Sequence, residues 1–175
     1  MFKVQTLNNI PVAGLEAFPR DRYEIASEMT HPDVLLLRSF DLHGWELPVM
    51  LKAVGRAGVG VDNIPVQRLT ELGVPVFNAP GANANAVKEL VLAGLLLGAR
   101  NICQAWEYTR GLTGADHEIA KTVEAEKKRF KGIELAGKTL GVIGLGAIGV
   151  QVANAAHGLG MRVVGFDPHI TVRNA

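Results

Sequence analysis

The sequence contains a single cysteine, Cys103, among 175 residues. The chain can therefore form no internal disulfide and offers no cysteine-rich metal site, and the reducing cytoplasm is the compartment we expect. An excess of charge of either sign is lacking too, since 18 Lys and Arg residues are balanced by 17 Asp and Glu residues. This balance argues against a basic face for nucleic acid or for an anionic membrane surface.

Long apolar runs are also absent. The N-terminus lacks the apolar stretch of about 7 to 15 residues that a signal peptide needs. The apolar run over residues 90–99 is shorter than the ~20 residues of a membrane span. A zinc-protease motif is incomplete, because His117 and Glu118 are followed by Lys121 where a second histidine would be required. We expect a soluble protein without a metal site.

The first hundred residues alternate between short aliphatic runs and helical patterns, which predicts a parallel α/β sheet. A helix is expected over residues 65–72, where Asp62 or Asn63 can cap the N-terminus and Gly73 can end the helix. The strands are expected at residues 3–7, 23–26, 34–38, 53–56 and 74–77.

The segment over residues 84–100 has the pattern of a longer helix that is apolar on nearly every face. A helix of this kind must be buried, and the pattern leaves open whether it packs between two domains or against a second subunit. Residues 109–131 are rich in charge and poor in large apolar side chains. They predict a solvated connection or arm.

The last segment reads as strand, turn, helix and strand. The turn, residues 144–149, has the pattern G-x-G-x-x-G between the strand at 139–143 and the helix at 148–159. This context predicts dinucleotide binding: Gly144 permits the turn, Gly146 leaves room for a pyrophosphate, and Gly149 lets the helix pack on the strand. The helix N-terminus, with Ala147 and Ile148, offers amides to phosphate.

The second strand of this segment, residues 162–166, is followed by an acidic residue. Asp167 lies 18 residues after Gly149, close to the ~20 expected for the carboxylate that binds the ribose hydroxyls of NAD. A carboxylate at this position would repel a 2′-phosphate. The sequence therefore predicts NAD rather than NADP as the cofactor.

Three stretches resemble the D-2-hydroxyacid dehydrogenase family. In that family, too, a complete α/β domain precedes the G-x-G-x-x-G turn, which we call the fingerprint. They are RAGVGVDNI at 56–64, VFNAPGAN at 76–83 followed by AVKEL at 86–90, and LAGKTLGVI at 135–143. The resemblance implies a flavodoxin-like substrate domain over 1–98 with an interdomain helix at 84–100. It further implies an arm over 99–133 and the first part of a Rossmann NAD-binding domain over 134–175.

The resemblance also implies roles for individual residues. It assigns the backbone of Val59 and Gly60 to the substrate carboxylate and places Val59 near the nicotinamide. Glycine-flanked amides of this kind can form an anion-binding nest. Arg38 and Ser39 resemble a pair that the phosphoglycerate dehydrogenase branch directs at its substrate, and Arg56 resembles an arginine that reaches the phosphate. The alternative for each arginine is a surface or interface salt bridge. Asn83 is a further substrate candidate, although turn formation also explains it and Asn78.

The family's catalytic groups lie later in the nucleotide domain: an Arg for the carboxylate and a His paired with a Glu for the hydroxyl proton. No histidine of this chain matches the catalytic one, so we expect the chain to be inactive alone, as a fragment, a split-gene product or a truncated chain. The five histidines are His31, His43, His117, His157 and His169.

Three functions are compatible with the sequence. The first is NAD-dependent oxidation of 3-phospho-D-glycerate to 3-phosphooxypyruvate, in serine synthesis. The second is the same chemistry on another 2-hydroxy acid, such as glyoxylate, hydroxypyruvate or lactate. The third is a noncatalytic NAD-binding module. The resemblance also implies a homo-oligomer, with a small and phosphorylated 2-hydroxy acid as substrate.

Overall fold

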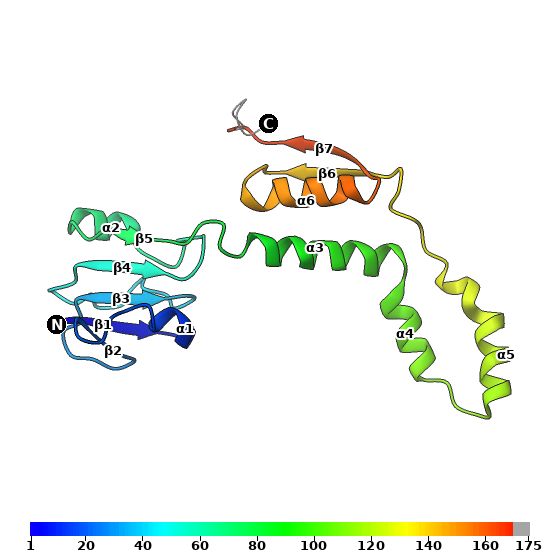
Figure 1. Cartoon of the computed structure of the whole chain (residues 1–175), viewed down its shortest axis with the longest axis horizontal. Coiled ribbons are helices and arrows are strands. Elements are labelled where there is room, and N and C mark those ends of the chain that lie inside the picture. The colour runs from blue at the N-terminus through cyan, green and yellow to red at the C-terminus, as the bar shows by residue number, and fades with distance from the viewer. Residues whose placement is uncertain (170–175) are drawn as a thin grey trace. The chain divides into compact units, whose positions relative to one another are not determined.

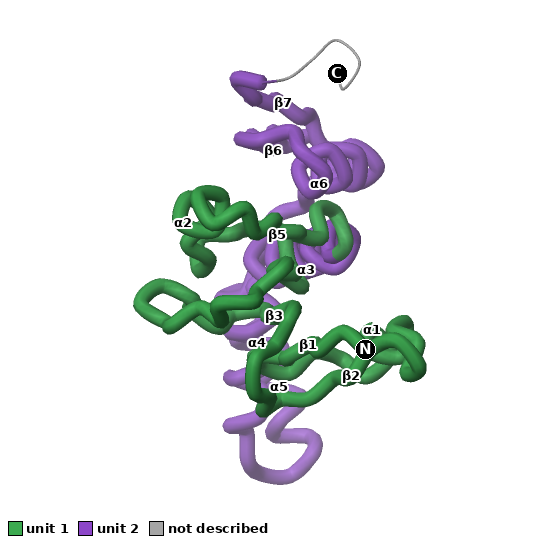
Figure 2. Tube along the Cα trace, turned by 90° about the vertical axis from the view of Figure 1, so that its left-hand side faces the viewer, with its two compact units in different colours: residues 1–82 green, residues 83–175 purple. Residues whose placement is uncertain are grey.

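The computed structural model describes residues 1–169. Its contacts divide the chain into two compact units, Met1–Ala82 and Asn83–Ala175, coloured green and purple in Figure 2. The division falls after Ala82 rather than after residue 98, because helix α3 (Ala84–Ala99) packs against helix α6 (Ala147–Gly158) of the second unit.

The first unit is built on a five-stranded sheet in which every neighbouring pair is parallel. The strand order β2-β1-β3-β4-β5 is that of flavodoxin-like folds, so the predicted fold class is confirmed. The strands are β1 (Phe2–Leu7), β2 (Tyr23–Ala26), β3 (Val34–Leu37), β4 (Ala53–Arg56) and β5 (Val76–Phe77), with helices α1 (Val12–Leu15) and α2 (Val66–Glu71) (Figure 1).

Strand β5 begins two residues later than expected. The amide of Val74 donates to the carbonyl of Leu69 in α2 at 2.8 Å, and the Val74 side chain is buried in the core. Pro75 has no amide hydrogen for the sheet. Val74 therefore ends the α2 connection, and the strand itself starts at Val76.

The core of this unit lies on the face of the sheet that α2 covers. Leu35 and Leu37 of β3, Val54 of β4 and Leu69 of α2 are fully buried. Full burial of each such side chain contributes about 1.5–3 kcal/mol. Because alternate residues of a strand point to opposite faces, Leu36 faces the other side of the sheet.

The second unit contains a two-stranded parallel sheet, β6 (Thr139–Ile143) and β7 (Arg162–Phe166), joined by α6. The predicted strand, turn, helix and strand are all present. Helix α3 forms as predicted, with Ala84 as the buried residue of this helix and the Leu90 side chain 73% exposed. Its burial between domains or against a second subunit stays a prediction. Within the described residues α6 covers one side of α3, and the rest meets solvent.

The segment expected to be an arm, residues 99–133, contains α4 (Ile102–Arg110), α5 (Asp116–Glu126) and a 3-10 turn, η1 (Lys127–Phe130) (Figure 1). Tyr108 and Phe130 pack with their ring centroids 5.2 Å apart, and the Arg129 guanidinium lies over both rings. Glu118, from the incomplete zinc motif, accepts a hydrogen bond from the Ala115 amide at 3.1 Å and so caps α5.

The two ends of the arm meet. The Ile133 amide donates to the Ala99 carbonyl at 2.8 Å, and the Asn101 side chain donates to the Lys131 carbonyl at 3.3 Å. A Cβ on Gly132 would overlap the Ala99 carbonyl oxygen and lie 2.6 Å from the Arg100 Cα. Only glycine fits this crossing.

No helix within residues 1–169 is long and apolar enough to cross a membrane.

Candidate functional site

The glycine-rich turn joins β6 to α6 in the second unit. Gly144 adopts a φ of +90°, the left-handed region that favours glycine, and its amide donates to the Phe166 carbonyl of β7 at 2.7 Å. A Cβ on Gly149 would overlap the Gly144 carbonyl oxygen and lie 3.0 Å from its carbon. Gly144 therefore makes the turn, and Gly149 permits the close approach of helix and strand.

Gly146 has a different environment. It is the N-cap of α6 in extended backbone, and among residues 1–169, apart from its two chain neighbours, no atom lies within 4 Å of where its Cβ would be. The protein itself therefore gives no reason for a glycine here, whereas an approaching phosphate would. The first amides of α6, at Ala147 and Ile148, have no carbonyl of the preceding turn to bind, and the helix dipole adds partial positive charge.

Asp167 lies beside this turn. Its Oδ2 accepts a hydrogen bond from the Leu145 amide at 2.8 Å, and its Oδ1 accepts one from the His169 amide at 2.8 Å. These two bonds, that of His169 first, hold the pKa of the carboxyl below its ordinary value of 3.8. Asp167 is ionised at neutral pH, and each oxygen keeps a lone pair for a ribose hydroxyl. The turn, the helix N-terminus and the carboxylate together fit a dinucleotide.

The second candidate region lies in the first unit, where β4 ends at Arg56. The Arg56 Nε donates to Asn63 Oδ1 at 3.1 Å. The guanidinium lies against the loop that follows: a Cβ on Gly58 would lie 3.0 Å from Arg56 Cζ, and one on Gly60 would lie 3.9 Å from Nη1. Among the described residues no carboxylate pairs with Arg56 within 4.0 Å.

The loop over residues 57–60 is held by hydrogen bonds from both sides. The Ala57 amide donates to the Leu37 carbonyl at 2.8 Å, and the Ala79 amide donates to the Gly58 carbonyl at 2.9 Å. Asn78 Nδ2 donates to the Val59 carbonyl at 2.8 Å, so this asparagine fixes the loop. Within residues 1–169, the amides of Val59 and Gly60 donate to no protein acceptor.

The two glycines of this loop contribute differently from what was expected. A nest uses left-handed residues to turn consecutive amides together, yet neither Gly58 nor Gly60 has a positive φ. Gly58 instead makes room for the Arg56 side chain, and a Cβ on Gly60 would lie 2.7 Å from Asp62 Oδ1. Glycine is needed here because neighbouring side chains fill the space.

Arg38 and Ser39 follow β3 in a turn that Asn8 organises. Asn8 adopts a φ of +83°, and its Oδ1 accepts hydrogen bonds from the amides of Arg38, Ser39 and Phe40 at 3.4, 3.1 and 2.6 Å. Arg38 is exposed and, like Arg56, has no ion-pair partner in the described part of the chain. The salt-bridge explanation therefore finds no partner for either arginine there.

Asn63 links these two regions. Besides accepting from Arg56, its Nδ2 donates to the carbonyls of Arg38 at 3.3 Å and Phe40 at 2.7 Å. The expectation that Asp62 or Asn63 caps the following helix is wrong, since the N-cap of α2 is Pro65 and no side chain caps it. Sequence patterns missed Asn63 and Asn8 as site residues. Asn83, in the second unit, occupies the N-cap position of α3 without a side-chain cap bond.

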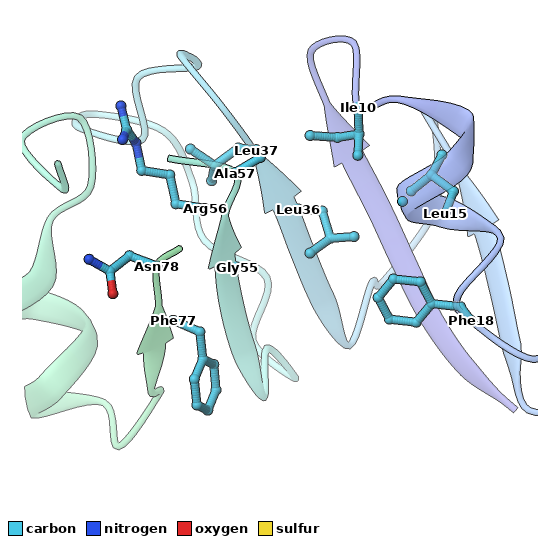
Figure 3. A pocket seen from close by; sticks show the side chains of 11 residues that line it. Ile10, Leu15, Phe18, Leu36, Leu37, Gly55, Arg56, Ala57, Phe77 and Asn78 are labelled. Carbon is cyan, nitrogen blue, oxygen red and sulfur yellow. The ribbon is translucent and has the colours of Figure 1, made fainter. Parts of the chain in front are cut away.

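A cavity of about 260 Å³ opens beside Arg56, on the face of the sheet opposite the core (Figure 3). Leu36 lies between the α1 side of this cavity, with Leu15 and Phe18, and the β5 side, with Phe77. The Arg56 guanidinium points away from these apolar side chains toward the loop after β4. The cavity is therefore an apolar hollow and not the anion site.

Among the described residues, one histidine ring contacts a carboxylate. His43 Nδ1 lies 2.8 Å from Asp41 Oδ1, but the two residues share one exposed turn. The bonds from His43 lower the pKa of Asp41 below its ordinary value of 3.8, that from the backbone amide first. Within residues 1–169 no group of three His, Cys, Asp or Glu side chains could hold a metal ion.

Comparison with known proteins points to one family. Residues 102–175 match the family model described as the D-isomer specific 2-hydroxyacid dehydrogenase, NAD binding domain. The chain is 47% identical over 150 residues to a D-3-phosphoglycerate dehydrogenase of Methanocaldococcus jannaschii, which covers 84% of this chain and 26% of that protein. It is 46% identical over 118 residues to a hydroxypyruvate reductase of Thermotoga maritima, covering 67% of this chain and 35% of that protein.

A solved structure agrees with this match. The NAD+-bound 3-phosphoglycerate dehydrogenase of Entamoeba histolytica superposes with a TM-score of 0.70 at 26% identity, over 99% of this chain and 56% of that one. The chain thus spans about a quarter to a third of the length of these curated relatives. The glycine-rich turn lies in the part of the chain that matches the NAD-binding domain, so NAD is its cofactor. The chain belongs to the D-isomer-specific 2-hydroxyacid dehydrogenase family.

Proposed function

We propose that the protein to which this chain belongs oxidises 3-phospho-D-glycerate to 3-phosphooxypyruvate with NAD, in serine synthesis. The observation that carries the proposal is the pair of arginines at the carboxyl ends of β3 and β4, Arg38 and Arg56, neither of which has an ion-pair partner in the described chain. Guanidinium groups bind carboxylate and phosphate through paired hydrogen bonds. The 47% identity to a D-3-phosphoglycerate dehydrogenase supports the same assignment.

The residues of the first unit bind and orient the substrate. The amides of Val59 and Gly60 have no protein acceptor in residues 1–169 and receive the substrate carboxylate. Arg38, Ser39 and Arg56 receive the phosphate. Asn83, the first residue of the second unit, stays a predicted substrate contact that rests on the family resemblance alone. These groups hold the C2 hydroxyl in one orientation, which is the main requirement for an oriented hydride transfer.

The residues of the second unit hold the cofactor. The amides of Ala147 and Ile148 bind the pyrophosphate, Gly146 leaves space for it, and Asp167 accepts hydrogen bonds from the adenosine ribose. NAD, when bound, supplies the hydride acceptor. The hydroxyl proton needs a base within hydrogen-bond reach. In this family the base is a His–Glu pair of the later nucleotide domain, so we propose that it lies outside this chain.

A second candidate reaction is the reduction of hydroxypyruvate or glyoxylate by the same machinery. The 46% identity to a hydroxypyruvate reductase favours it. The two reactions differ in the phosphate, so a panel of substrates with and without phosphate separates them. We expect Arg56→Met in the longer protein to raise KM for 3-phosphoglycerate about tenfold or more and to change KM for hydroxypyruvate little. Equal losses on both substrates would contradict the phosphate role.

The chain itself gives the third possibility, an NAD-binding module without turnover. Calorimetry with NAD and an assay of NADH formation from 3-phosphoglycerate test it directly. We expect the 175-residue chain to form no NADH, because its histidines offer no base at the reacting hydroxyl. Turnover at an enzymatic rate by this chain would overturn the placement of the catalytic groups outside it.

We further propose that the protein is a cytoplasmic homo-oligomer. Helix α3 leaves Leu90, Val91, Leu96 and Leu97 exposed, and an exposed apolar helix face is typical of a subunit contact. Sedimentation of the chain and of Leu90→Glu checks this proposal. We expect the variant to shift toward monomer, whereas an unchanged mass distribution would exclude α3 as the contact.

A further inference from the structure

We propose that Asn63 is a positioning residue that holds Arg56 and the Arg38–Phe40 turn in a single anion-binding arrangement. The inference deepens the proposed function and rests on it for the identity of the anion. Asn63 does not itself contact the substrate in this proposal. It acts through the two arginines. Its side-chain oxygen accepts a hydrogen bond from Arg56, and its side-chain nitrogen donates one to the backbone carbonyl of Arg38.

The contacts define how the Asn63 amide is oriented. Arg56 Nε can only donate, so the atom 3.1 Å away must be the amide oxygen. The carbonyls of Arg38 and Phe40 can only accept, so the atom at 3.3 and 2.7 Å from them must be the amide nitrogen. All three bonds agree on one orientation. Only a side chain with a donor and an acceptor on one short arm makes them together.

The bond to Arg56 decides which part of the guanidinium is available. With Nε bound to Asn63, the two Nη groups remain for a ligand, and they have no acceptor among residues 1–169. The same bond holds the guanidinium against Gly58, next to the loop whose Val59 and Gly60 amides are also free there. Asn63 thus holds the charge beside the loop that carries the Val59 and Gly60 amides.

The bonds to the turn fix the second arginine. Asn8 binds the amides of Arg38, Ser39 and Phe40, whereas Asn63 binds carbonyls of the same turn. The turn is therefore held from both sides, but only Asn63 also contacts Arg56. Asn8 is for this reason a matched control: its loss loosens the turn and leaves the Arg56 bond intact.

The experiment uses the 175-residue chain and two readouts. The first is the NMR signal of the Arg56 Nε–H, assigned with Arg56→Lys, and its rate of exchange with water. The second is the affinity for 3-phosphoglycerate by calorimetry. In Asn63→Ala we expect the Nε–H to exchange about tenfold faster and the affinity to fall about tenfold. In Asn8→Ala we expect the Arg56 signal to stay as it is in the native chain.

Several outcomes would overturn the inference. An Asn63→Ala chain with native exchange at Arg56, or with native affinity for 3-phosphoglycerate, excludes the positioning role. If the native chain binds no 3-phosphoglycerate, the arginines of this chain are not sufficient for substrate binding, and the exchange rate alone then decides the role of Asn63. If Asn63→Ala does not fold, Asn63→Asp replaces it, since a carboxylate still accepts from Arg56 and cannot donate to the turn. In Asn63→Asp we expect the Arg56 Nε–H to exchange as slowly as in the native chain and the backbone amides of residues 38–40 to exchange faster. Fast exchange at Arg56 with native exchange at residues 38–40 would reject the inference.

Discussion

The carboxylate of Asp167 accepts a hydrogen bond from the Leu145 amide at 2.8 Å, which ties the end of β7 to the glycine-rich turn after β6. The residue expected to bind the ribose is therefore also a structural part of the turn that binds the pyrophosphate. One side chain thus connects the two halves of the cofactor site.

Asp167 gives a prediction about pH. Its pKa is lowered in the folded chain, so the ionised form is favoured by folding. The contribution of Asp167 is then fully present above the ordinary value of 3.8 and is lost as pH falls through the lower folded value. We expect the carboxyl carbon resonance of Asp167 to titrate below pH 3.8, and NAD affinity to be independent of this group from pH 5 upward. Titration of Asp167 above 4 would contradict the two hydrogen bonds.

The glycines of the fingerprint are predicted to respond differently to alanine. Gly149→Ala places a methyl group on the Gly144 carbonyl, and such overpacking costs typically about 1–3 kcal/mol. Gly146→Ala meets no protein atom within 4 Å. We expect chemical denaturation to detect a loss of stability in the first variant only, and calorimetry to detect a loss of NAD affinity in both. A Gly146→Ala chain with native affinity would show that the phosphate lies elsewhere.

The crossing at the base of the arm gives a further stability prediction. Gly132→Ala would place its Cβ among backbone atoms of Ala99 and Arg100, which cannot move as a side chain can. We expect the free energy of unfolding to fall by ~1–3 kcal/mol. The control is Gly98→Ala in α3, where nothing lies within 4 Å and helix propensity predicts a gain of about 0.5–1 kcal/mol. Equal effects of the two changes would argue against the close crossing.

Asp33 is predicted to stabilise the first unit. Its Oδ2 accepts from the Lys3 amide at 2.8 Å, and its Oδ1 pairs with Lys52 Nζ at 2.7 Å. The Lys52 hydrogen bond, followed by that from Lys3, lowers the pKa of Asp33. We expect Asp33→Ala to lower the unfolding free energy by ~1–3 kcal/mol at neutral pH.

The sign of the pKa shift fixes how this difference varies with pH. Because the folded pKa is lowered, the stabilisation by Asp33 is present above 3.8 and disappears as pH falls through the folded value. Denaturation of both chains at pH 7 and near pH 3 checks this. A difference that grows toward acid would contradict it.

Sequence patterns predicted a structural feature where all the residues that determine it lie in one short segment. The glycine-rich turn was predictable because Gly144 and Gly149 each meet a backbone requirement, Gly146 leaves open space at the start of α6, and Asp167 follows at a set spacing. The five strands were predictable for the same reason, and the start of β5 was missed by two residues. There a tertiary bond, from the Val74 amide to Leu69, decided the boundary.

Features that depend on a partner were not predictable. Asn63 was expected, as one of two candidates with Asp62, to cap a helix, because Asn and Asp before a helix commonly do so. It instead bridges Arg56 and a turn that lies about 25 residues earlier in the sequence. The burial of α3 stays a prediction for a related reason: hydrophobicity indicates that a face will be covered, but not whether the cover lies in the same chain or in a second subunit.

Because Ala99 contacts Gly132 and Ile133, the two ends of the arm lie side by side, and the arm is an insertion between them. The chain leaves α3 and returns to nearly the same point, so the length and composition of everything between can change without altering the path from α3 into β6. A short turn could replace the arm there. Selection can therefore tailor this segment independently of the nucleotide fingerprint that follows it.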